Sequence, residues 1–94
     1  MISINKLIWD EWNTAHISRH HVAPDEVEQV CHGDYVTLET YKGRVIVIGP
    51  TKTGNLLFIV LAPKEEGIYY PVTARVADRK ERAYYKQIKG GDRK

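Results

Sequence analysis

Residues 44–76 read RVIVIGPTKTGNLLFIVLAPKEEGIYYPVTARV, and this stretch decides the fold. It holds three apolar runs rich in β-branched residues, Arg44–Ile48, Asn55–Ala62 and Ile68–Val76, separated by short polar loops with proline or glycine. Such runs predict β-strands, and strands joined by short loops pair antiparallel. The run 55–62 is apolar almost throughout, which is typical of a central strand covered on both faces.

A fourth strand and two helices are predicted ahead of this stretch. Residues 35–41 alternate apolar and polar side chains and are followed by the short turn Lys42-Gly43. Asp10 has the position of an N-cap for a helix that runs to about His20. A second helix begins at Pro24, beside two acidic residues, and ends at Gly33.

A last helix is predicted from Asp78, which has capping-box spacing to Glu81. The predicted fold is therefore α+β, with two N-terminal helices, a four-stranded and mainly antiparallel sheet, and a C-terminal helix. A length of 94 residues predicts one domain spanning residues 1–94, in which residues 90–94 form a frayed tail.

The net charge of +2 is unevenly distributed along the chain. Residues 1–40 have two basic and seven acidic side chains, a net charge of −5, whereas residues 75–94 have eight basic and three acidic side chains, a net charge of +5. A basic end of this kind indicates either contact with a polyanion or a solvated tail.

Other features of the sequence predict a cytoplasmic protein without cofactors. We find neither a signal peptide nor an apolar run near the ~20 residues that span a bilayer. Cys31 is the one cysteine, so no internal disulfide can form, and its apolar neighbours predict a buried and unreactive thiol. The sequence also lacks a P-loop and a dinucleotide-binding fingerprint.

The strongest candidate site combines the last strand with the last helix. Strict alternation places Tyr69, Pro71, Thr73 and Arg75 on one face of the strand, and Arg75 then lies close to the start of the helix. Guanidinium groups match phosphate oxygens with paired hydrogen bonds, and a tyrosine can stack on an unpaired base. On the helix, the residues spaced to share one basic side with Tyr85 are Arg79, Arg82, Lys86 and Lys89.

This composition is compatible with metal-free RNA cleavage but is not specific to it, because many ordinary nucleic-acid-binding helices have a similar composition. Cleavage needs fixed positive charge at the phosphate and groups that move protons, for which lysine, histidine or tyrosine would serve. Lys80, between Arg79 and Arg82, and His20 are the candidates for proton transfer.

A second group of residues lies on the first predicted helix. Trp9, Asn13, His16 and His20 have the spacing of one helical face, which predicts a polar face packed on the sheet. His16 and His20 could also bind a metal, but no third ligand has a supporting spacing, so we expect no metal site.

The sequence resembles the BrnT family of toxins from about residue 8 to residue 86. Three motifs give the resemblance: Trp9-Asp10…Asn13…His16…His20-x-Val22 with Asp25-Glu26-Val27, then Gly43-Arg44-x-x-x-Ile48-Gly49-x-Thr51-x-x-Gly54, and then Thr73-Ala74-Arg75-x-Ala77-x-Arg79-Lys80-Glu81-Arg82-x-x-Tyr85. The chain departs from the family pattern at His21, where glycine is usual, and at Asn55, where arginine is common.

The resemblance implies a RelE-like ribonuclease fold and metal-independent endoribonuclease activity that inhibits translation. It also implies a toxin–antitoxin pair, in which a DNA-binding, BrnA-like antitoxin of the ribbon-helix-helix type binds the toxin. In the roles that we expect, Arg75 and Arg79 hold the scissile phosphate, Lys80 or His20 moves a proton, and Tyr85 stacks or donates. The residues expected to bind the rest of the RNA are Arg44, Lys52, Arg82 and Lys86.

Two other functions remain open at this point. One is a catalytically inactive relative that binds RNA or only its partner protein. The other is an adaptor domain, in which the basic helix binds an acidic peptide.

Overall fold

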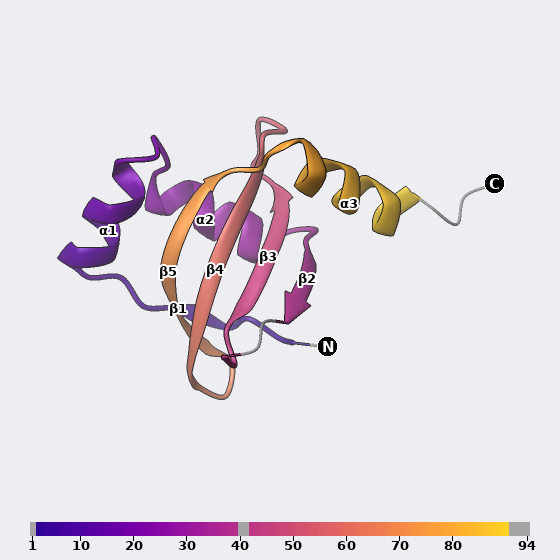
Figure 1. The fold of residues 1–94 in the computed structure, drawn as a ribbon. Helices are drawn as coiled ribbons and strands as arrows, with labels where there is room; N and C mark the ends of the chain where they lie inside the picture. The colour runs from indigo at the N-terminus through magenta and orange to yellow at the C-terminus, as the bar shows by residue number, and fades with distance from the viewer. Residues whose placement is uncertain (1, 40–41, 91–94) are drawn as a thin grey trace.

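The computed structural model describes residues 2–39 and 42–90 and is shown in Figure 1. In chain order the elements are β1 (Lys6–Leu7), α1 (Glu11–Ser18), α2 (Pro24–Cys31), β2 (Val36–Glu39), β3 (Val45–Pro50), β4 (Leu56–Glu65), β5 (Ile68–Val76) and α3 (Arg79–Gly90). The predicted α+β class, the helices and the four strands are confirmed, while residues 40–41 at the end of the predicted strand 35–41 lie outside the described residues. The predicted frayed tail falls mainly on residues 91–94, outside the described residues, while Gly90 is the last residue of α3.

The sheet has the strand order β1-β5-β4-β3-β2 and one more strand than we predicted. β2 to β5 pair antiparallel, as expected, but β1 adds a parallel strand at the free edge of β5. The sequence prediction missed β1 because its two residues show no periodicity; its hydrogen bonds to β5, such as that from the N–H of Ile8 to the carbonyl of Tyr69 at 2.9 Å, arise only in the folded chain.

Both N-terminal helices begin where the sequence indicates. The Asp10 carboxylate accepts a hydrogen bond from the backbone N–H of Asn13, and the Asn13 side chain accepts one from the N–H of Asp10, each at 2.9 Å. This capping box lowers the pKa of Asp10, chiefly through the N–H of Asn13. α2 begins at Pro24 and buries Val27, Val30 and Cys31.

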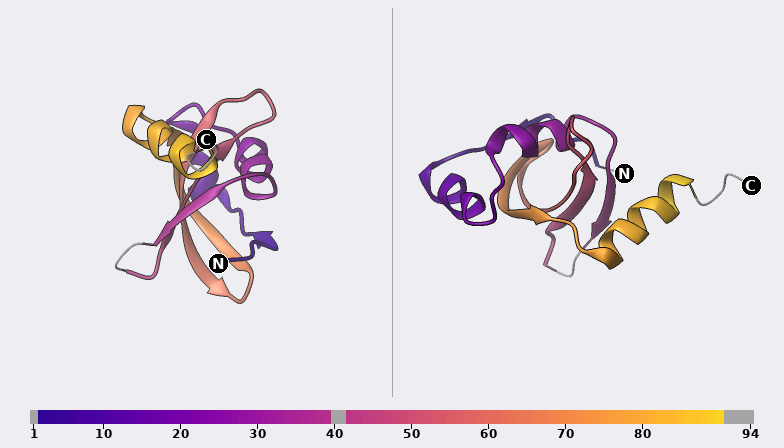
Figure 2. Two further views of the ribbon diagram at one scale, coloured as in Figure 1. Left: turned by 90° about the vertical axis from the view of Figure 1, so that its right-hand side faces the viewer. Right: turned by 90° about the horizontal axis from the view of Figure 1, so that it is seen from above.

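α2 covers one face of the sheet, α1 lies beside β5, and α3 projects from the other end of the molecule. α2 packs against β3 and β4, α1 packs against β5, and α3 contacts β2 and β3 (Figures 1 and 2). No helix among the described residues is long and apolar enough to cross a membrane.

The prediction that residues 55–62 are covered on both faces is wrong. Leu57, Ile59 and Leu61 of β4 are buried toward the helices, whereas Phe58 and Val60 are only half-buried on the opposite face. Burial therefore alternates along β4 although the residues are all apolar. One face of the strand packs against the helices, and the other face is largely not covered by a helix (Figure 2).

Candidate nucleic-acid interface

The side chain of Arg75 lies on the open face of the sheet, where β5 leads into α3. Arg75 pairs with Phe58 of β4 and Thr73 pairs with Val60, so these four side chains share the open face. The predicted alternation is wrong over part of β5, because Val72 is an extra residue between Pro71, which pairs with Leu61, and Thr73. This bulge leaves Pro71 and Ala74 both buried, and it separates Arg75 from the face of Pro71.

Three neighbours hold the guanidinium of Arg75. Its Nη1 and Nη2 donate to the two carboxylate oxygens of Glu81 at 2.9 and 2.7 Å, and Nη1 also lies 3.3 Å from the carbonyl of Val76. The Cζ atom lies 4.2 Å from the centre of the Phe58 ring. The hydrogen bonds to Glu81 raise the pKa of Arg75, which favours its charged form.

Glu81 also fixes the start of α3. Its carboxylate accepts a hydrogen bond from the N–H of Asp78 at 2.8 Å, and Asp78 accepts one from the N–H of Glu81 at 2.9 Å. The predicted capping box is therefore present. The same carboxylate binds Arg75, so the helix start and the last strand are tied together through one side chain.

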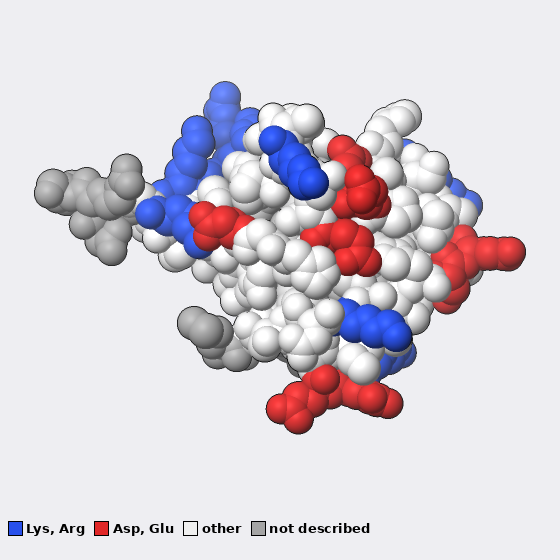
Figure 3. Space-filling view, turned by 180° about the vertical axis from the view of Figure 1, so that it is seen from behind, with Lys and Arg blue, Asp and Glu red and all other residues white. Residues whose placement is uncertain are grey.

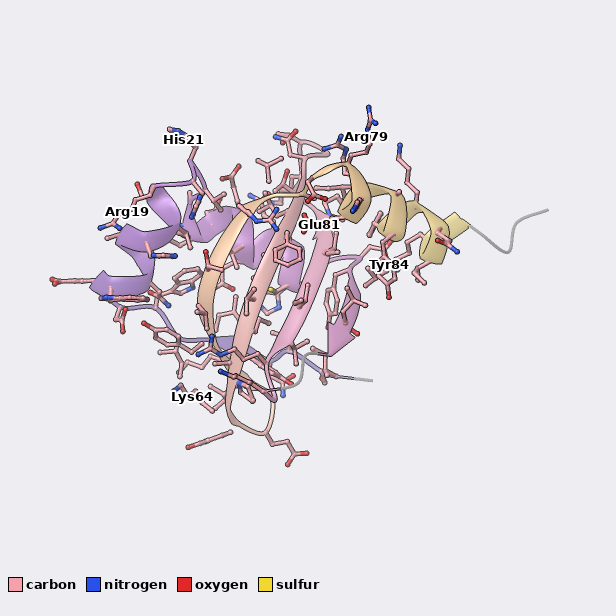
Figure 4. All side chains as sticks on the ribbon, viewed as in Figure 1. Arg19, His21, Lys64, Arg79, Glu81 and Tyr84 are labelled. Carbon is pink, nitrogen blue, oxygen red and sulfur yellow. The ribbon has the colours of Figure 1, made fainter. Side chains whose placement is uncertain are left out.

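The remaining cations of α3 differ in how they are engaged. Arg82 donates to the carbonyl of Ala77 at 2.8 Å. Arg79, Lys80 and Lys86 are exposed and have no hydrogen-bond or ion-pair partner within residues 2–39 and 42–90. Figure 4 shows Arg79 pointing away from the sheet, so these side chains are available to a ligand.

Tyr85 attaches α3 to the rest of the molecule. Its hydroxyl donates to the carbonyl of Asp34 at 2.9 Å, and Lys89 forms an ion pair with the carboxylate of the same residue. Burial, together with the charge of Asp34, raises the pKa of Tyr85. The phenol is thus a protonated donor to backbone, and its hydroxyl is already in use.

Lys52 lies at the same end of the molecule as the start of α3. The loop 51–55 leads into Leu56, whose carbonyl accepts a hydrogen bond from the N–H of Ala77 at 2.9 Å. The N–H of Lys52 is held by the side chain of Gln29. The exposed Asn55 lies in this loop as well.

Arg44 and His20 lie away from this group, contrary to the expected convergence. Arg44 precedes β3 at the end where Val45 pairs with Leu61, about 20 Å along the strand from the end near α3. His20 follows α1, which packs against β5, whereas α3 contacts β2 and β3. Figure 4 shows Arg19 and His21, the neighbours of His20, far across the sheet from Arg79.

The predicted polar face of α1 is also only partly correct. Asn13 is fully buried and donates to the carbonyls of Ile8 and Pro71 at 3.0 and 3.1 Å. Trp9 precedes the helix and donates to Glu28, while the ring of His16 stacks on exposed Trp12 and meets the edge of His20. In the described ranges no three His, Cys, Asp or Glu side chains are placed to hold one metal ion.

The charge asymmetry of the sequence is also an asymmetry of the surface. Seen from behind in Figure 3, the largest group of basic side chains lies near α3, at the upper left, whereas acidic side chains and a few further basic ones are spread over the remainder of that face. The basic end therefore consists of Arg75, Arg79, Lys80, Arg82 and Lys86 with Lys52, a set that we name the cationic end.

Comparisons with known proteins point to one fold. No family model and no curated protein matches the chain. Among solved structures, the crystal structure of the Brucella abortus ribonuclease toxin BrnT is similar, with a TM-score of 0.64 and 21% sequence identity, and covers 79% of this chain and 97% of that one. The chain has the BrnT fold. At this identity the likeness confirms the predicted architecture, and the function has to be argued from the site.

Glu81 and Phe58 are the site residues that sequence reasoning missed. The spacing of Glu81 from Asp78 indicated a helix cap and gave no sign of Arg75. Phe58 belongs to an apolar run, and the sequence of that run does not distinguish a residue buried in the core from one that packs against a guanidinium.

Proposed function

We propose that the chain is a metal-independent endoribonuclease, the toxin of a toxin–antitoxin pair, that inhibits translation by cutting RNA. The observation that supports this most directly is the cationic end on a fold shared with a ribonuclease toxin. The guanidinium of Arg75 is held in place by other residues, and exposed ammonium and guanidinium groups belong to the same cationic end. A phosphodiester is the ligand that such a set of groups recognises best.

In this proposal Arg75 and Arg79 hold the scissile phosphate. Their fixed positive charge stabilises the extra negative charge that develops as the ribose 2′-OH attacks phosphorus. Lys80 is exposed, follows Arg79 in the sequence and is the candidate for proton transfer. Lys52, Arg82 and Lys86 bind flanking phosphates. We assign no step to His20 or Arg44, because they lie away from the cationic end. We assign none to the Tyr85 hydroxyl, because it is hydrogen-bonded to the carbonyl of Asp34.

The proposed partner is a DNA-binding antitoxin of the BrnA kind, and the proposed place of action is the cytoplasm. In this proposal the antitoxin binds the cationic end, where the substrate phosphates would also bind. A partner that covers Arg79 and Lys80 would therefore prevent RNA from binding.

A second function, RNA binding without cleavage, is favoured by one group of observations. The Tyr85 hydroxyl is engaged by backbone, His20 is remote, and Asn55 stands where the family pattern has a cation. The number of groups able to move protons near Arg75 is therefore small. Under this alternative the cationic end would hold RNA, and the RNA would stay intact.

The deciding experiment incubates the purified chain with end-labelled single-stranded RNA in excess EDTA. We expect cleavage with 2′,3′-cyclic phosphate ends, and none with 2′-O-methyl RNA. Arg79→Ala should lower the rate about 10- to 100-fold. Lys6→Ala, which removes an exposed cation from β1, is the matched control and should leave the rate unchanged. If the chain binds the RNA and slows its migration on a gel but never shortens it, the nuclease proposal fails and RNA binding without cleavage replaces it.

A further inference from the structure

The contacts of Arg75 suggest a role for the two residues that hold it. A guanidinium has five N–H groups, arranged on two edges that can each bind an oxyanion with two hydrogen bonds. Glu81 occupies the edge formed by Nη1 and Nη2, at 2.9 and 2.7 Å. The other edge, formed by Nε and the second N–H of Nη2, has no hydrogen-bond partner in the part of the chain that the structure describes.

Phe58 supports the same group from one side. Its ring lies under the guanidinium, with the Cζ atom 4.2 Å from the ring centre. The carboxylate sets the direction in which the guanidinium points, and the cation–π contact with the ring adds a second restraint. Arg75 is therefore a pre-oriented donor, whose rotamer entropy is lost on folding rather than on binding RNA.

Arg75 and Glu81 differ in how far their side chains are exposed to solvent. The Glu81 side chain is 16% exposed and the Arg75 side chain is 38% exposed. The carboxylate is therefore turned inward between strand and helix, whereas more of the Arg75 side chain is exposed. Because the Nε–Nη2 edge has no partner among the described residues, it is the edge that a phosphate would bind while Glu81 keeps its contact.

We propose that Glu81 and Phe58 are positioning residues that aim the Nε–Nη2 edge of Arg75 at the RNA phosphate. This inference rests on the proposed function and deepens it. Glu81 acts through Arg75 and does not itself touch the substrate. Its negative charge opposes RNA binding in general, so its benefit should appear in the rate of the chemical step rather than in affinity.

The first test measures kcat and KM of Glu81→Gln and Glu81→Asp on single-stranded RNA. Glutamine keeps an oxygen that can accept the N–H of Asp78, and aspartate keeps the charge but is too short for the paired contact. In both variants kcat should fall about tenfold, while KM changes less than about threefold. Asp34→Asn, which removes the ion pair of α3 with Lys89 and leaves Arg75 alone, is the matched control for a loosened helix.

The second test asks whether Glu81 acts through Arg75. In an Arg75→Ala background, Glu81→Gln should cause no further loss of kcat, because the group that it positions is gone. Additive losses, an equal loss in Asp34→Asn, or a higher kcat in Glu81→Gln would each overturn the proposal. The last result would mean that Glu81 competes with the phosphate.

A third measurement does not depend on cleavage. The Nε–H NMR signal of Arg75 should shift when uncleavable 2′-O-methyl RNA is added, and it should stop responding in Glu81→Gln. If the signal responds as expected but natural RNA stays intact, the proposed nuclease fails and the positioning stands. If RNA is cut while the Arg75 signal never moves, the positioning fails and the nuclease stands.

Discussion

The helices α2 and α3 are both amphipathic, but they are attached to the sheet in different ways. α2 buries Val27, Val30 and Cys31, each worth about 1–3 kcal/mol of apolar burial. α3 buries no residue and is attached by Glu81, Arg82, Tyr85 and Lys89 through hydrogen bonds and ion pairs. Exposed ion pairs are worth about 0–1 kcal/mol each.

This difference shows how a small domain can keep a charged surface available. Apolar packing holds the α1 and α2 side in place irrespective of salt. The α3 side is held by directional polar contacts around its edge, which leaves Arg79, Lys80 and Lys86 exposed on its outer face. The cost is a helix whose docking is weak and sensitive to ionic strength.

The largest effect should come from the packed side, at Asn13. Asn13→Leu leaves the carbonyls of Ile8 and Pro71 buried without a donor and should lower the free energy of unfolding by about 3 kcal/mol, as measured in urea. Gln87→Leu, which likewise replaces a side-chain amide with leucine but at an exposed position of α3, should alter it by less than about 0.5 kcal/mol. Equal losses would remove the distinction between the two sides.

The buried thiol of α2 should give the packed side its own pH dependence. Burial raises the pKa of Cys31 from 9.0 to about 12, so the neutral thiol stabilises the fold below pH 9, and this contribution is lost as the pH rises toward 12. Cys31→Ala should cost about 1–2 kcal/mol at neutral pH, and its deficit should shrink between pH 9 and 12. Parallel stability curves for the two proteins would contradict this, since both share every tyrosine.

The turn between α1 and α2 offers a gain in stability. His21 has a φ of 63°, the left-handed region, and is the one non-glycine residue with positive φ in the described ranges. His21→Gly should raise the free energy of unfolding by about 0.5–1 kcal/mol. His20→Gly next to it has no such strain to relieve and should lower it. A loss in both variants would show that the His21 side chain makes a contribution that outweighs its backbone strain.

The smallest global effect should come from α3. Asp34→Asn removes the ion pair with Lys89 and should change the free energy of unfolding by about 0.5 kcal/mol or less. Amide hydrogen exchange in the last turns of α3 should nevertheless become faster, as it should in the unmutated protein at high salt, while α2 stays protected. If α2 loses protection too, the two helices are coupled more tightly than their contacts indicate.

Much of this molecule follows from local sequence. Asp10, Pro24 and Asp78 fix helix starts because caps and proline act within one turn, and the strands of residues 44–76 are marked by β-branched runs between short loops. The gathering of positive charge near the C-terminus is likewise visible in the sequence. His21 has the left-handed backbone that glycine favours, which its own sequence position does not indicate.

The tertiary structure alone decided which of these residues meet. The bulge at Val72 changed the face to which Arg75 belongs, and the strand order placed His20 and Arg44 away from α3. The contacts of Glu81 and Phe58 with Arg75 connect α3 with β4 and β5. Local preferences act over a few residues, whereas these contacts depend on strand register and on which elements pack together. The periodicity of a single sequence specifies neither the register nor the packing.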